Sequence, residues 1–141
     1  MTANVTQENQ ALRTLKIIVF TVVGVALMVG AVWRASATRR FVARAASAAG
    51  EVTKLNAGGS HPEVRFTTAA GQVIEYPQGG MISGYRVGDR VEVLYEPESP
   101  RSSAVLNRPG ALWGFTLTTF LMGAVFVLLP QLARRWPEWI G

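Results

Sequence analysis

Two long stretches of the chain contain no charged residue, and they constrain the fold more than any other feature. The first, Ile17–Trp33, has seventeen residues, of which ten are Ile, Val, Leu or Phe. As a helix it would be roughly 25 Å long, slightly short of a hydrocarbon core of about 30 Å. The second, Pro109–Ala133, has twenty-five residues. We therefore predict two transmembrane helices, near residues 17–33 and 112–129.

Tryptophans and basic residues mark the ends of both stretches. All four tryptophans lie at or just beyond these ends, and none lies in the middle of the chain. Indole prefers the membrane–water interface, and long basic side chains can reach the headgroups from just inside it. We expect the following residues at the membrane interface: Lys16, Trp33, Arg34, Arg39, Arg40, Arg44, Trp113, Arg134, Arg135, Trp136 and Trp139.

The first stretch has an alternative interpretation as a signal peptide, because Ala35-Ser36-Ala37 resembles a cleavage site. We favour a retained helix, since sixteen residues precede the apolar run and Arg34 stands directly before the small residues. A buried helix of a soluble domain fits less well, because the rest of the chain is too small to cover it on all sides.

The segments around the apolar stretches complete the predicted organisation. The sequence after Trp33 is rich in Ala and Arg, so the first helix should continue as a basic stalk. The stalk would either bind anionic lipid headgroups or present a solvated basic face. We predict a flexible tail at 1–12, a transmembrane helix with its stalk at 13–46, a β domain at 47–108, a second transmembrane helix at 109–133 and an interfacial tail at 134–141.

Between the helices the sequence changes to short β-type segments separated by turn residues. Apolar and polar residues alternate in Glu63–Thr68 and Arg90–Glu96, which is the period of a half-buried strand. Further strands are expected at Glu51–Leu55, Gln72–Tyr76 and Ser103–Asn107. The sequence therefore predicts an α+β membrane protein, in which two transmembrane helices flank a small antiparallel β-barrel-like domain of OB-like or SH3-like kind.

Part of this middle region is similar to a known family. The similar segments are His61-Pro62-Glu63-Val64-Arg65-Phe66, Ala70-Gly71-Gln72 and Tyr85-Arg86-Val87-Gly88-Asp89-Arg90-Val91-Glu92-Val93-Leu94-Tyr95-Glu96-Pro97. With the Ala48–Val52 segment and a helix at each end, they resemble the bacterial membrane family known as domain of unknown function 3592. The resemblance implies the same architecture and a multi-pass location in the bacterial cytoplasmic (inner) membrane. It implies no shared activity and no catalytic residues.

Residue types that carry chemistry are scarce. The chain has no cysteine, which excludes disulfides and thiolate sites, and His61 is its only histidine. The acids of the middle region alternate with apolar residues, as outward-facing strand positions do, and no spacing pairs two of them in a cleft. No phosphate loop or nucleophile elbow is present. We therefore predict no catalytic residue, no metal site and no cofactor, and an enzyme is the least favoured class.

The distribution of charge argues against nucleic acid and bears on orientation. Residues 45–108 contain six basic and seven acidic residues, so the net charge of +5 comes from the flanks of the apolar stretches. A β domain without a basic groove is not expected to bind nucleic acid. Seven basic residues lie near the two ends of the connecting segment, against four in the tails, which favours a cytoplasmic β domain by the positive-inside rule. The connection is 78 residues long, which exceeds the range of that rule.

These features favour a non-enzymatic protein-interaction module, either an accessory subunit or an immunity-type protein that neutralises a toxin at the membrane. The alternative is a membrane protein that senses a lipid or a small ligand. The expected partners are the lipid bilayer and another protein. Because specificity usually lies in loops, the candidate contact surface is the Gly/Pro-rich loop with Pro77, Gln78, Gly79, Gly80 and Met81.

Small residues in the apolar stretches indicate where helices can approach closely. Gly110 and Gly114 form a GxxxG pair, and Ala26 and Gly30 form a second pair of small residues. Packing of the two helices within one chain and formation of a homo-oligomer both account for such pairs.

Overall fold

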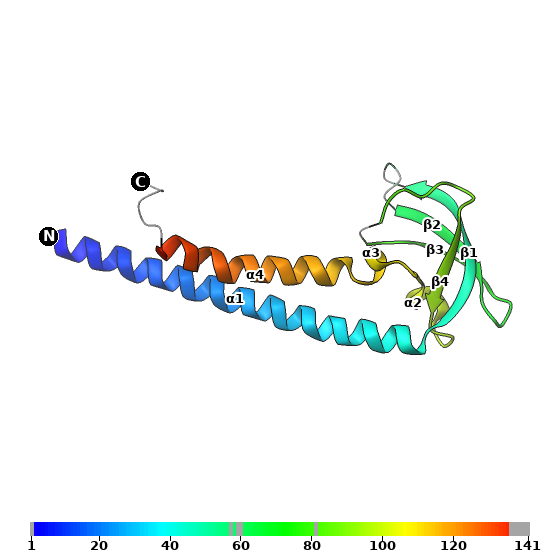
Figure 1. Cartoon of the computed structure of the whole chain (residues 1–141), viewed down its shortest axis with the longest axis horizontal. Helices are drawn as coiled ribbons and strands as arrows, with labels where there is room; N and C mark the ends of the chain where they lie inside the picture. Colours follow the sequence, from blue (N-terminus) through cyan, green and yellow to red (C-terminus); the bar gives the residue numbers. More distant parts are fainter. Residues whose placement is uncertain (1, 57, 59–60, 81, 136–141) are drawn as a thin grey trace. The chain divides into compact units, whose positions relative to one another are not determined.

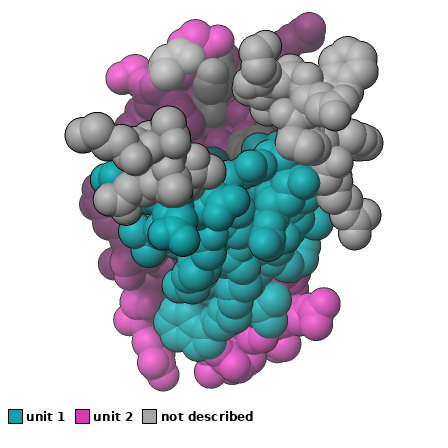
Figure 2. Space-filling view, turned by 90° about the vertical axis from the view of Figure 1, so that its left-hand side faces the viewer, with its two compact units in different colours: residues 1–33, 117–141 teal, residues 34–116 magenta. Residues whose placement is uncertain are grey.

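The computed structural model describes residues 2–56, 58, 61–80 and 82–135 (Figure 1). The chain divides into two compact units, which Figure 2 colours separately. Unit 1 comprises residues 1–33 and 117–141, and unit 2 comprises residues 34–116. The described part contains two helices that are long and apolar enough to cross a membrane.

The two long helices are α1, Thr2–Arg44, and α4, Gly114–Arg135. Helix α1 includes residues 2–12, where the sequence predicted a flexible tail. These residues contain no Gly or Pro that would interrupt a helix, and extending an existing helix costs much less than nucleating a new one. Apolar side chains of both helices are largely exposed, including Val29 and Leu117 at 63% and 58%.

Within unit 1, α1 and α4 meet at a pair of glycines. A Cβ atom at Gly24 would lie 2.6 Å from the carbonyl oxygen of Gly123, and one at Gly123 would lie 2.7 Å from that of Gly24. Both positions therefore exclude a side chain at the present helix separation. The sequence predicted a contact through small residues but favoured other positions, and Gly30 has no atom within 4 Å of its Cβ position. A homo-oligomer, which the pairs of small residues would allow, stays a prediction.

Unit 2 contains a curled antiparallel sheet of five strands in the order β3-β2-β1-β4-β5. The α+β class and the small antiparallel β domain predicted from the sequence are thereby confirmed. The shorter elements are β1 Ala46–Asn56, β2 His61–Thr67, β3 Val73–Pro77, β4 Arg90–Tyr95, α2 Pro100–Ser103, β5 Val105–Leu106 and α3 Pro109–Leu112.

The central strand β1 begins five residues before the predicted Glu51. Ala46 pairs with Tyr95, and Gly50 pairs with both Val91 of β4 and Phe66 of β2. The ladder with β4 outweighs the helix propensity of the Ala-rich segment, so the stalk ends at Arg44. Gly50 is required for this packing, because a Cβ atom there would lie 3.0 Å from the carbonyl oxygen of Arg65.

The core of unit 2 lies on the inner face of the curled sheet. Its fully buried members come from four strands and include Val52, Val64, Val93 and Leu106, each at 0% exposure. Three rings fill the middle: Phe66 packs against Tyr76 and Tyr95 with ring centroids 6.0 and 5.2 Å apart. This aromatic cluster fixes the β3 end of the sheet, where the candidate contact loop begins.

Candidate functional site

A buried glutamine joins the two edges of the curled sheet. Gln78 directly follows β3 and is only 5% exposed. Its Oε1 accepts hydrogen bonds from the Tyr76 hydroxyl at 3.1 Å and from the Leu106 backbone N–H at 2.7 Å. Since β3 and β5 are the outer strands of the sheet, this side chain supplies the link that a backbone ladder would otherwise make.

Burial changes the electrostatics of this link. Removal from water raises the pKa of Tyr76 far above its ordinary value, so the hydroxyl stays protonated and donates to Gln78. The backbone N–H of Gln78 also donates to the carbonyl of Pro62 at 2.9 Å. The start of the loop is therefore held by both side-chain and backbone hydrogen bonds.

The rest of the loop is held against the sheet at two further points. Gly80 adopts a φ of 102°, and a Cβ atom there would lie 3.1 Å from the Cα of Ala111 in α3. Ile82 packs partly buried against the hydrophobic core. Next to these anchors, Gly79, Ser83 and Gly84 are exposed. The described part of the loop is thus anchored to the sheet and exposed to solvent.

The predicted contact residues divide into different groups in the structure. Pro77, Gly79 and Gly80 are exposed, and their role in binding a partner stays a prediction. Gln78 is buried and shapes the loop from beneath. Met81 lies outside the described residues. The sequence did not indicate that Gln78 would be buried, because a Gln-Gly-Gly segment is typical of an ordinary exposed turn.

The arginines of the basic stalk have different surroundings within unit 2. Arg34 lies over the ring of Phe115 at 4.9 Å from its centroid, a cation–π contact. Arg44 pairs with Glu96 at 3.8 Å, although the stalk segment itself contains no acid. Arg39 and Arg40 are exposed. All four arginines of the stalk are nevertheless exposed.

The other residues predicted at a membrane interface lie in both units. In unit 1 Lys16 and Arg134 are exposed, Trp33 is 73% exposed, and Arg135 is the last residue of α4. In unit 2 Trp113 is half-buried. Their place at an interface stays a prediction, and Trp136 and Trp139 lie outside the described residues.

The outer face of the sheet carries a small polar cluster centred on Glu75. Its carboxylate accepts hydrogen bonds from the Thr53 hydroxyl at 2.7 Å and from the Arg65 guanidinium at 3.2 Å. These bonds, chiefly that from Thr53, lower the pKa of Glu75 below its usual 4.5. The cluster links β1, β2 and β3 on the solvent-facing side of the sheet. We interpret it as a structural feature that stabilises the sheet.

The described residues assemble no group of three or more His, Cys, Asp or Glu side chains that could hold a metal ion. His61 is exposed at the first position of β2. Among the described parts of the β domain, the exposed loop and the polar sheet face are two features that a partner could contact.

The fold therefore defines a class of small α+β proteins with a pair of long apolar helices and a curled five-stranded sheet. The chain is 43% identical over 107 residues to immune protein Tsi4 of Pseudomonas aeruginosa, a match that covers 76% of this chain and 74% of that protein. The chain belongs to the family of immune protein Tsi4. No family model matches the chain and no solved structure matches it, so the resemblance to domain of unknown function 3592 stays a prediction.

Proposed function

We propose that this chain is an immunity protein, which binds a toxin protein and thereby protects the cell that makes it. The observation that carries the proposal is the 43% identity to an immune protein over about three quarters of both chains. An immunity protein of this kind works by binding and needs no catalytic group. The sequence also favoured a protein-interaction module, either an accessory subunit or an immunity-type protein.

The loop from Pro77 to Gly84 is the surface proposed to contact the toxin. Its anchors at Gln78, Gly80 and Ile82 support this, because residues held in place before binding lose less conformational entropy when a partner docks. The exposed glycine Gly79 has no atom within 4 Å of its Cβ position, which leaves room for a partner to approach the backbone.

The protein is proposed to act from a membrane that both long helices cross. Only 11% of the most apolar stretch of each helix is buried inside the protein, whereas a core helix of a soluble protein is buried on most sides. Exposing such stretches to water would cost about 25 cal/mol for each Å² of apolar surface. Lipid would remove that cost, which supports the two-span arrangement predicted from the sequence.

Protection of cells from the toxin tests the proposal. The toxin is defined operationally, as a protein from the same organism that arrests cells lacking this chain. Co-production of the wild-type chain should restore growth. Gly79→Arg should abolish protection, because it places a long side chain on the proposed contact surface, at a position where no atom lies within 4 Å of the new Cβ.

Ala70→Arg is the matched control for this experiment. It adds the same side chain at an exposed position in the β2–β3 turn, at the opposite end of β3 from the loop. It should protect cells as the wild type does. Equal protection by Gly79→Arg and Ala70→Arg would remove the loop from the proposal, and no protection by the wild-type chain would refute the immunity function.

A further inference from the structure

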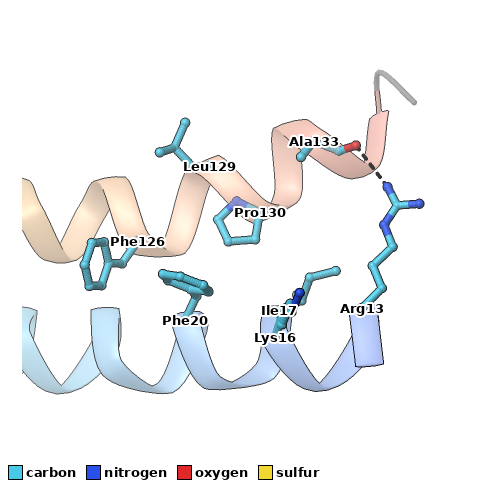
Figure 3. A pocket seen from close by; sticks show the side chains of 8 residues that line it. All are labelled: Arg13, Lys16, Ile17, Phe20, Phe126, Leu129, Pro130 and Ala133. Carbon is cyan, nitrogen blue, oxygen red and sulfur yellow. Dashed lines mark hydrogen bonds between the residues drawn. The ribbon is translucent and has the colours of Figure 1, made fainter. Parts of the chain in front are cut away.

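Unit 1 contains an apolar slot between α1 and α4, next to the end of α4. Its volume is about 360 Å³. Figure 3 shows Ile17 and Phe20 reaching from α1 toward α4, and the ring of Pro130 reaching back toward α1. Phe126 closes the slot on its inner side, where its ring meets Phe20 edge to face with centroids 5.5 Å apart.

Pro130 has a second effect on this slot besides lining it. A proline inside a helix has no N–H to donate to the carbonyl four residues earlier, which here is that of Phe126. The slot therefore lies where α4 lacks one hydrogen bond of its own backbone ladder. Proline is strongly disfavoured in the interior of a helix. Pro130 therefore sets this part of α4 apart from the rest of the helix.

Two cationic side chains stand at the mouth of the slot. Arg13 donates from Nη2 to the carbonyl oxygen of Ala133 at 3.3 Å, which is one of the last carbonyls of α4 and has no partner within the helix. Lys16 lines the slot and makes no hydrogen bond or ion pair with the residues that the structure describes. The described ion pairs, Arg44–Glu96 and Arg65–Glu75, both belong to unit 2.

We infer that this slot binds one anionic phospholipid, whose phosphate pairs with Arg13 and Lys16 and whose acyl chain lies along Ile17 and Phe20. The inference rests on the membrane location given under the proposed function. The observation that selects an anionic lipid is the charge at the site, because both charged residues that line the slot are cations. Basic pockets between transmembrane helices are known to hold anionic headgroups.

The dimensions of the slot fit an acyl chain better than a protein helix. From Ala133 at the mouth to Phe126 at the inner end, α4 rises about 10 Å. A slot of this depth would reach from the headgroup boundary into the outer part of a hydrocarbon core. A helix with side chains is about 10–12 Å wide, so a volume of about 360 Å³ would hold less than one of its turns. A single lipid chain can fill this space.

Binding of phosphatidylglycerol to the purified full-length chain tests this inference. Native mass spectrometry in mild detergent counts the bound lipids and gives the affinity during a titration. The wild-type chain should hold one phosphatidylglycerol more tightly than phosphatidylcholine. Removing both cations with Arg13→Gln and Lys16→Gln should weaken binding about 25-fold, or about fivefold for each. Arg90→Gln with Arg101→Gln removes the same charge from unit 2 and should leave the affinity unchanged.

A second pair of variants tests the slot without changing charge. Ala133→Phe places a ring at the mouth of the slot and keeps the backbone carbonyl that Arg13 contacts. It should displace phosphatidylglycerol. Ala26→Phe adds the same ring at an exposed position of α1 outside the slot and should have no effect. Lys16→Gln alone, which removes no hydrogen bond described within the protein, covers the case in which the double cation variant fails to fold.

Three results would overturn the inference. They are equal affinity for phosphatidylcholine and phosphatidylglycerol, retention of phosphatidylglycerol by both Lys16→Gln and Ala133→Phe, and displacement of the lipid by inorganic phosphate at similar concentration. If the chain protects cells and resists carbonate extraction but shows one of these results, the slot inference alone fails. If carbonate extracts the chain from membranes, the lipid site and the proposed membrane location fail together.

Discussion

Replacing Gly24 with alanine should weaken the packing of α1 against α4, whereas the same change at Gly30 should not. The two glycines lie six residues apart in one helix. A Cβ atom at Gly24 would stand 2.6 Å from the carbonyl oxygen of Gly123 and 2.8 Å from Cγ2 of Val127. At Gly30 nothing lies within 4 Å.

The expected magnitude follows from two opposing terms. Gly→Ala in a helix interior stabilises the helix by about 1 kcal/mol, and both variants receive this gain. Only Gly24→Ala also incurs overpacking against a backbone atom, which typically costs about 1–3 kcal/mol. Gly30→Ala should therefore be more stable than the wild type, and Gly24→Ala should be less stable than Gly30→Ala by about 1–3 kcal/mol.

Unfolding by sodium dodecyl sulfate in mixed micelles, followed by tryptophan fluorescence, measures this difference as a free energy of unfolding. Gly123→Ala should reproduce the effect of Gly24→Ala, because its Cβ atom meets the reciprocal carbonyl at 2.7 Å. Equal stabilities for the Gly24 and Gly30 variants would show that α1 and α4 do not pack through these glycines.

Three further predictions concern the β domain and its placement. Gln78→Ala should lower the free energy of unfolding by about 2–6 kcal/mol, because two buried donors lose their acceptor at about 1–3 kcal/mol each, and thermal unfolding followed by circular dichroism measures this. The pKa of Glu75 is lower in the folded protein than its ordinary value of 4.5. The stability advantage of the wild type over Glu75→Gln should therefore be complete above pH 4.5 and disappear as the pH falls through the pKa of the folded protein. A difference in stability that is independent of pH would contradict this. In a chain without cysteine, Gln10→Cys and Ser83→Cys should react with an impermeant maleimide from opposite sides of the membrane, and the charge count favours Ser83 on the cytoplasmic side.

Much of the fold follows from local patterns in the sequence. Uncharged apolar runs and alternating residues depend on neighbours a few positions away, so the two long helices and all five strands could be located. The start of β1 could not, because Ala46–Ala49 becomes a strand only through its pairing with β4, more than forty residues later. Local Ala-rich composition favours a helix there, and tertiary pairing overrides it.

The features that shape the candidate sites depend even more on distant residues. Gln78 is buried because its amide meets Leu106, 28 residues along the chain. The choice of Gly24 rather than Gly30 for the helix contact depends on the position of Gly123. No pattern within α1 distinguishes the two glycines. Pro130 differs from these residues, because a proline inside an apolar run indicates a local irregularity in a helix without reference to any distant residue.

Competition between a strain that lacks this chain and its parent tests the immunity function most directly. If the chain neutralises a toxin that the parent produces, the deletion strain should lose viability in mixed culture with the parent. The wild-type chain supplied in trans should restore survival, and the Gly79→Arg variant should not. Survival of the deletion strain at the parental level, beside a parent shown to arrest cells of a toxin-sensitive strain, would contradict the account.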